Sequence, residues 1–170
     1  MNTRFRDFGK VNYHTIETPA ERTVHVRHYL FVKPDYFVVW DTFEEAHGPS
    51  TFWLHPMKEL KDEGNGFFRA GEAGAPHLRV QFVLPAKPDV IENVSLGNLW
   101  SFGVRNGSGQ PYLAVLVPQK DERGIVAAYD EAARTLHLTG KNVDDTIVLP
   151  EPGSVDQLPK VVRGAGPGQR

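Results

Sequence analysis

Residues 24–44, VHVRHYLFVKPDYFVVWDTFE, hold two apolar, β-branched runs that meet at a turn over residues 33–35. Side chains alternate between the two faces of a strand. In residues 22–32 one face is apolar and the other is aromatic and basic, whereas in residues 36–43 both faces are apolar. The second run nevertheless carries a single acid, Asp41. The stretch therefore predicts two strands inside packed sheets, the second of them buried on both sides.

The rest of the chain repeats this pattern. Apolar and β-branched runs of about five to eight residues recur between clusters of Gly, Pro, Asn and Asp, which is typical of an all-β domain. Helix formers follow one another only in residues 130–134, too few for a stable helix. We predict an antiparallel, jelly-roll-like β-sandwich of two sheets with about eleven strands and negligible helix. The twelve candidate runs, of which 66–70 is the weakest, are 11–17, 22–32, 36–43, 50–56, 66–70, 77–84, 89–94, 98–105, 111–117, 124–130, 133–139 and 144–149.

The length of 170 residues suits one domain with a single core, which we place in residues 1–150. After Pro150 the sequence is rich in Pro and Gly and poor in large apolar residues, so residues 151–170 are predicted to form an irregular strap or tail. The positive residues of positions 1–14 have no apolar run behind them, so we expect no export signal. No segment has the length and hydrophobicity of a membrane span.

Charge and cysteine content exclude several classes of function. Lys and Arg number 19 against 21 Asp and Glu, which leaves no basic footprint for nucleic acid. The chain has no cysteine, which excludes thiol catalysis, disulfides and cysteine metal sites. The sequence also lacks a glycine-rich phosphate loop, a serine-hydrolase elbow and a zinc-protease helix.

An ordered series of apolar strands with a few polar residues between them runs through residues 20–150. The series consists of Arg27, Leu30-Phe31-Val32, Pro34-Asp35-Tyr36-Phe37-Val38-Val39, Asp41, Trp53-Leu54-His55 and the strand Tyr112-Leu113-Ala114-Val115-Leu116-Val117-Pro118. This series resembles the C-terminal β-sandwich of heparinase II/III-like polysaccharide lyases.

The resemblance implies a fold and an ancestry more strongly than an activity. Full-length members of that family place an α/α toroid before the sandwich and cleave uronate-containing glycans by proton abstraction and β-elimination. The toroid supplies much of the catalytic set, including a tyrosine, and the early sandwich strands add a histidine pair and further metal ligands. We find neither a toroid nor the closely spaced His-x-His in this sequence. The resemblance therefore implies a sandwich separate from its catalytic partner.

Asp41 is the most informative polar residue, because a carboxylate among Phe, Val and Trp must be paired or must line a site. The matched series makes Arg27 its expected partner. Two interpretations stay open. The residues form a buried cross-strand pair that fixes register, or Asp41 orients Arg27 to grip a sugar carboxylate or sulfate in bidentate fashion.

Histidines are the natural ligands for a divalent metal. His25 and His28 are three residues apart, which places them on opposite faces of a strand. A site made of His25, His55 and Asp41 forms only if strands 22–32 and 50–56 are neighbours, and nothing in the spacing requires it. A metal enzyme needs at least three donors to converge from His25, His28, His47, His55 and Asp41. The alternative is that these are hydrogen-bonded residues of the sandwich.

Tryptophans beside polar residues suggest a carbohydrate site, because the apolar face of a sugar stacks on an aromatic ring while its hydroxyl groups meet polar side chains. Such combinations are also ordinary in a sandwich core, where we expect Trp40 to lie. The predicted ligand-binding residues are Arg27, Trp53, His55, Trp100 and Arg105.

Three functions follow. The first is a carbohydrate-associated sandwich that binds a polysaccharide, for which an acidic chain is the candidate, or that serves as the accessory part of a lyase. The second is a metal-assisted, polysaccharide-cleaving enzyme with a histidine site inside a jelly roll. The third is a structural or assembly module that docks a catalytic partner domain or associates with itself. Neither nucleic acid nor a membrane is expected as a partner.

Overall fold

The computed structural model describes residues 2–6, 9–18, 21–44, 46, 48–72 and 74–164, with side chains described from His25 onward. Within these residues the secondary structure is entirely β. The strands are β1 (Asn2–Arg6), β2 (Gly9–Thr18), β3 (Glu21–Val32), β4 (Tyr36–Glu44), β5 (Ser50–Leu54), β6 (Leu60–Gly64), β7 (Phe67–Ala70), β8 (His77–Leu84), β9 (Asp89–Ser95), β10 (Trp100–Asn106), β11 (Tyr112–Gln119), β12 (Val126–Asp130), β13 (Thr135–Gly140), β14 (Val143–Val148) and β15 (Lys160–Arg163).

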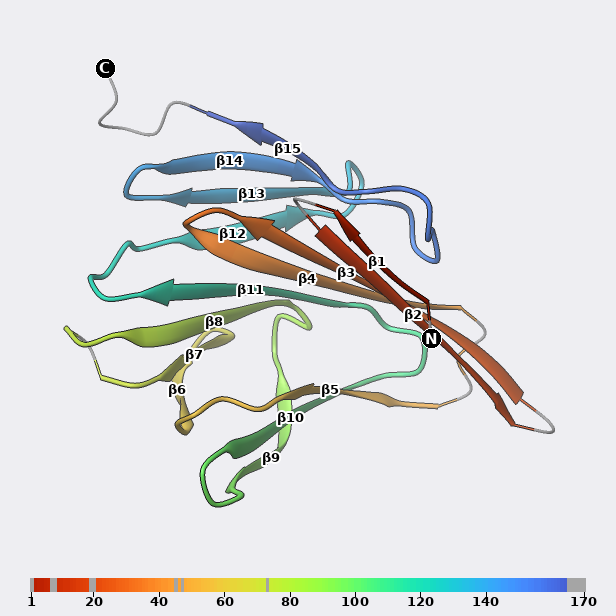
Figure 1. The fold of residues 1–170 in the computed structure, drawn as a ribbon, viewed down its shortest axis with the longest axis horizontal. Helices are drawn as coiled ribbons and strands as arrows, with labels where there is room; N and C mark the ends of the chain where they lie inside the picture. The colour runs from red at the N-terminus through yellow and green to blue at the C-terminus, as the bar shows by residue number, and fades with distance from the viewer. Residues whose placement is uncertain are drawn as a thin grey trace.

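The strands form three antiparallel sheets (Figure 1). The large sheet has eight strands in the order β1-β2-β3-β4-β11-β8-β7-β6. The small sheet has three strands in the order β5-β10-β9, and the C-terminal sheet has four in the order β12-β13-β14-β15. Antiparallel neighbours can be joined by short turns, which suits a chain punctuated by Gly and Asn.

The large sheet is the middle layer, and β4 is buried on both of its faces. Tyr36, Val38 and Trp40 on one face pack with residues of the C-terminal sheet in one core cluster. Val39, on the other face, packs with Phe52 and other residues of the small sheet in a second cluster. The predicted all-β antiparallel sandwich is therefore confirmed. It consists of a large sheet with a smaller sheet packed on each of its two faces, rather than of one pair of sheets.

All twelve candidate runs contain strands, including the weak one, which forms β7. Three further strands bring the total to fifteen among the residues that the structure describes. One of them, β6, reads LKDEG and is exposed except at Leu60. Another, β15, lies in the predicted strap and pairs with β14. Both are short edge strands, whose pairing depends on the neighbouring strand rather than on an apolar pattern of their own.

Residues 151–159 have no regular secondary structure and contact β3 at His28 and β4 at Thr42. The Gly153 N–H donates to Thr42 Oγ1 at 3.0 Å, and His28 Nε2 lies 3.2 Å from the Gln157 carbonyl oxygen. These contacts fasten the segment to the large sheet. They also place His28 under the strap, where 1% of the residue is exposed.

Candidate functional site

The outer face of the small sheet carries an exposed tryptophan. Trp53 of β5 lies directly across from Gly103 of β10, and 41% of the residue is exposed. A Cβ atom added at Gly103 would stand 2.6 Å from Cζ3 of the Trp53 ring and 2.9 Å from Cη2. The indole therefore lies against the backbone of β10, in space that any side chain at position 103 would occupy. One side of the ring rests on the sheet.

Arg105 belongs to the same face. It follows Gly103 by two residues on β10 and lies opposite Thr51 of β5, diagonal to Trp53. Because successive side chains of a strand point to opposite faces, Trp53 and Arg105 both lie on the side of the small sheet away from Phe52, which is buried in the core. Arg105 is exposed. The structure thus brings together two of the predicted ligand-binding residues.

Trp100 and His55 lie elsewhere. Trp100, at the start of β10, is half-buried and shares the parity of Phe102, which faces the core. His55 follows the end of β5 and is exposed at a shallow pocket that His77 also lines. Neither residue lies next to Trp53 and Arg105 on the outer face of the small sheet.

Arg27 is part of the large sheet and forms an ion pair with Asp41. The two residues are directly opposed on β3 and β4. Arg27 Nε donates to Asp41 Oδ1 at 2.5 Å, and Nη2 donates to Oδ2, so the contact is bidentate. Asp41 is fully buried, whereas the Arg27 side chain keeps 20% of its surface exposed. This is the cross-strand pair expected if the residues fix register.

The surroundings of Arg27 hold it in place. Its guanidinium lies 4.8 Å from the centroid of the Phe52 ring, and Nη1 donates to the Tyr29 hydroxyl at 3.2 Å. Burial on its own lowers the pKa of Arg27, but the hydrogen bonds and negative charge of Asp41 outweigh it and raise the pKa above its ordinary value. The guanidinium is therefore charged, and its donors are already bound to Asp41 and Tyr29. It lies on the opposite side of the small sheet from Trp53.

The predicted metal donors are only partly brought together. His25 Nε2 lies 3.4 Å from Asp41 Oδ1, and the His25 ring stacks on Phe43 with centroids 4.7 Å apart. His28 points to the other face of β3, as its spacing from His25 predicts. His47 lies outside the described residues. Among the side chains that the structure describes, no three His, Asp or Glu residues converge as metal ligands, so the set His25, His55 and Asp41 does not form a site there.

Gly103 is the component that the sequence analysis missed. A glycine inside a strand that otherwise reads WSFGVRN is a recognisable signal, because it often marks a close approach by another group. The approaching group proves to be the Trp53 ring. The described part of the chain holds no helix that is long and apolar enough to span a bilayer.

Comparison with known proteins gives structural neighbours only. No family model matches the chain, and no curated protein sequence does. A mutant of heparan sulfate lyase HepC from Pedobacter heparinus is 13% identical with a TM-score of 0.61, over 90% of this chain and 28% of that one. A second HepC structure is 12% identical with a TM-score of 0.57, over 96% and 27%. A heparinase III is 14% identical with a TM-score of 0.55, over 96% and 27%.

These similarities concern the fold, because identities of 12–14% carry no more than that. The chain spans somewhat more than a quarter of the length of each lyase, at 27–28%. Nearly all of this chain is nevertheless covered by the matches. The chain therefore has the fold of a β-rich portion of heparan sulfate lyases.

Proposed function

We propose that this chain is a carbohydrate-associated β-sandwich that binds a polysaccharide on the outer face of its small sheet, as the accessory part of a lyase. The observation that carries the proposal is the Trp53 ring held flat against Gly103 with its other side exposed. The fold shared with heparan sulfate lyases supports the class of ligand.

A flat, immobilised aromatic ring suits a sugar for a physical reason. The C–H face of a pyranose ring is apolar and stacks on an indole, while its hydroxyl groups stay hydrated or meet polar neighbours. Because Gly103 supports the inner side of the ring, little rotamer freedom is left to lose when a sugar binds. Trp53 is thus prepared for stacking before the ligand arrives.

Arg105 adds a preference for an acidic chain. Its guanidinium is exposed diagonal to Trp53, and a planar guanidinium holds a carboxylate or sulfate through two parallel hydrogen bonds. Asp89 lies across from Arg105 on β9 and limits the net positive charge of this face. We therefore expect binding of moderate affinity that weakens as salt is added.

Titration calorimetry with heparan sulfate and with a neutral glucan tests the proposal. Trp53→Ala is expected to weaken binding by at least about tenfold, which corresponds to 1.4 kcal/mol. Gly103→Val, which displaces the ring without removing it, is expected to do the same. Met57→Ala, which changes another strongly exposed apolar residue, is the matched control and leaves affinity unchanged. If the unmodified protein shows no measurable binding to acidic glycans, the proposal is contradicted.

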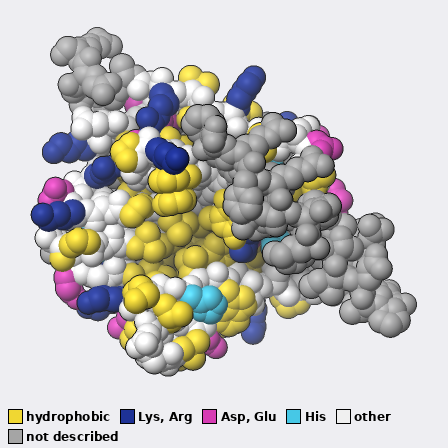
Figure 2. Space-filling view, in the orientation of Figure 1, with side chains coloured by type: hydrophobic (Ala, Val, Ile, Leu, Met, Phe, Trp, Pro, Cys, Tyr) yellow, Lys and Arg dark blue, Asp and Glu magenta, His cyan; other side chains and the backbone are white. Residues whose placement is uncertain are grey.

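A second candidate function, assembly with a partner domain, is favoured by β9 and the loop after it. Strand β9 is an edge of the small sheet, and large apolar residues are exposed along this segment. They are Val90, Ile91, Val94, Leu96 and Leu99. Exposed edges and apolar clusters are typical of surfaces that another chain or domain covers. Figure 2 shows a further apolar area at the centre of one face of the molecule, with Lys and Arg mainly around it.

Light scattering on the purified chain separates the two candidates. Self-association that Val94→Lys abolishes supports assembly through β9. A monomer at every concentration tested excludes self-association through β9, and glycan binding by that monomer supports the polysaccharide proposal. Val126→Lys, which adds the same charge at an exposed position on an edge strand of the C-terminal sheet, controls for charge.

A further inference from the structure

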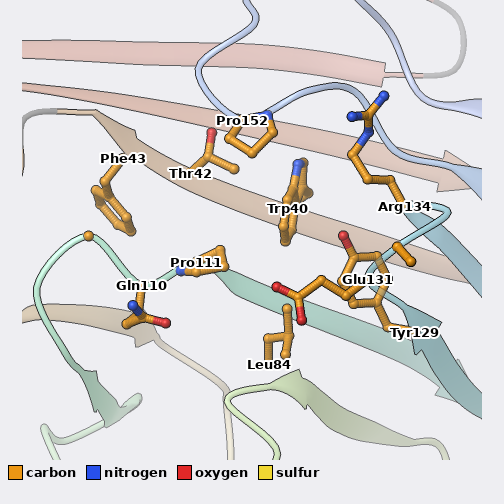
Figure 3. A pocket seen from close by; sticks show the side chains of 12 residues that line it. Trp40, Thr42, Phe43, Leu84, Gln110, Pro111, Tyr129, Glu131, Arg134 and Pro152 are labelled. Atoms are coloured by element: carbon orange, nitrogen blue, oxygen red, sulfur yellow. The ribbon is translucent and has the colours of Figure 1, made fainter.

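A pocket of about 470 Å³ lies between the large sheet and the C-terminal sheet (Figure 3). Four segments that are distant in sequence meet around it. They are the end of β4, the end of β8, the loop before β11, and the turn between β12 and β13, and Pro152 of the strap adds to the wall. The volume falls in the range of small-molecule sites, about 300–1,000 Å³.

The floor of the pocket is apolar and aromatic. Trp40 and Tyr129 face one another with ring centroids 6.0 Å apart and an angle of 47° between the planes. Leu84 and Pro111 extend this surface toward β8 and the loop before β11. Trp40 is 2% exposed, and its Nε1 has no hydrogen-bond partner among the described residues. A buried donor without an acceptor is costly, and few such groups occur in a native protein.

The rim of the pocket is polar and carries both signs of charge. Gln110, Glu131 and Arg134 are all exposed and all line it. Arg134 Nη2 lies 3.3 Å from Glu151 Oε1, and both side chains remain largely exposed. Burial raises the pKa of Tyr129, and the negative charge of Glu131 raises it further, so its hydroxyl keeps its proton and can donate. An amide, a carboxylate, a guanidinium and a phenol thus surround an apolar floor.

This pocket differs in shape from the Trp53 face, and none of its residues belongs to that face. A flat ring contacts one side of a sugar and accepts any unit along a chain. A pocket encloses a ring and suits a chain end or a free sugar. Hydroxyl groups that point in several directions require donors and acceptors around the ring as well as an apolar surface below it.

We propose that the Trp40–Tyr129 pocket is a second saccharide site, which encloses one pyranose ring at the end of a chain. The choice of a sugar as ligand rests on the proposed function, whereas the site itself rests on the pocket. Tyr129, Leu84 and Pro111 form the platform. Gln110, Glu131 and Arg134 bind the hydroxyl groups.

Indole N–H signals in ¹⁵N-labelled protein test this site separately from the Trp53 face. The chain has three tryptophans, so Trp53→Phe and Trp100→Phe assign the three signals. N-acetylglucosamine and glucuronic acid are titrated first, followed by heparan sulfate. We expect the monosaccharides to shift the Trp40 signal with a Kd of about 1 mM. Ala132→Phe, which fills the pocket from its rim, is expected to weaken this binding at least tenfold, whereas Ala128→Phe on an exposed strand position leaves it intact.

Each of the other possible outcomes supports or overturns either the saccharide site in the pocket or the binding face around Trp53. If heparan sulfate shifts Trp53 while no sugar shifts Trp40, the pocket is not a saccharide site and the proposed function stands. If monosaccharides shift Trp40 while Trp53 stays silent, the pocket is supported and the Trp53 face fails. If cyclohexanol shifts Trp40 and both sugars fail to, the pocket takes apolar ligands and the inference is overturned.

Discussion

The large and small sheets use their polar and aromatic residues in opposite ways. In the large sheet, a charged pair lies inside the protein: Asp41 is fully buried and Arg27 holds it through two hydrogen bonds. In the small sheet, an aromatic ring lies outside: 41% of Trp53 is exposed. Each arrangement reverses the usual distribution of these residue types.

The difference shows which sheet supports the fold and which one presents a surface. A buried ion pair gains little over an apolar pair but specifies which residues must face each other. An exposed ring gains little for folding and is available to a ligand. Variants in the large sheet should therefore affect stability, and those in the outer face of the small sheet should affect binding.

The largest effect is expected from Arg27→Met. Removal of the guanidinium leaves the buried Asp41 without its partner, which costs about 3–5 kcal/mol of the free energy of unfolding. Urea denaturation measures this loss. The double variant Arg27→Met/Asp41→Leu is the control, and it should recover most of the stability because no charge remains buried. A loss below about 1 kcal/mol in the single variant would show that the pair is not structural.

Tyr36→Phe should have a smaller effect than Arg27→Met. The Tyr36 hydroxyl donates to Asp145 Oδ2 at 2.7 Å and joins the large sheet to the C-terminal sheet. Its loss leaves a buried carboxylate without this donor, which costs about 1–3 kcal/mol. Arg163→Met removes a longer contact of 3.5 Å to the same oxygen together with the ion pair to Asp35, and because the Arg163 side chain is half-exposed the two together should cost less than about 1 kcal/mol. Equal losses in the two variants would contradict the special role of the hydroxyl.

His28 should make stability depend on pH. Burial lowers the pKa of His28 below its ordinary value of 6.5. In acid the unfolded chain therefore takes up a proton at His28 that the folded chain does not. The contribution of His28 to the free energy of unfolding is fully present above pH 6.5 and is lost as the pH falls below it. Denaturation at several pH values should show a shallower fall for His28→Leu. His55→Leu, the same substitution at an exposed position, is the matched control.

Trp53→Ala should have the smallest effect on stability. Its ring is partly exposed, and we expect a loss of no more than about 1 kcal/mol. The buried Trp40 should cost about 3–5 kcal/mol when it is replaced by Ala. Thermal unfolding of the two variants compares them directly. A large loss for Trp53→Ala would mean that its ring serves the core and that its exposure is incidental.

Much of the fold follows from the sequence, because the alternation of residues 36–43 shows directly that both faces of β4 need cover. The same alternation does not say which strands provide that cover. Three sheets therefore form where two were expected. The pairing of Arg27 with Asp41 was predicted, and the turn over residues 33–35 brings the two into register.

The candidate sites depend on distant parts of the chain and were harder to predict. Trp53 is equally suited to a core or a surface, and only the position of the small sheet decides between them. The supporting Gly103 follows it by 50 positions. The Trp40 pocket needs segments from β4 to residue 152, and no local pattern records that they meet.

The contacts of Asp35 have a consequence for biosynthesis. Asp35 accepts hydrogen bonds from Arg123 at 2.7 Å and from Arg163 at 2.6 Å, partners that lie 88 and 128 residues later in the chain. At about 5–20 residues per second, the ribosome needs roughly 6–26 s to reach Arg163 after it has added Asp35. During that interval both apolar faces of β4 await strands that have not yet been translated. The nascent chain is therefore most prone to aggregation before its C-terminal sheet emerges, and a chaperone that holds residues 36–44 would protect it.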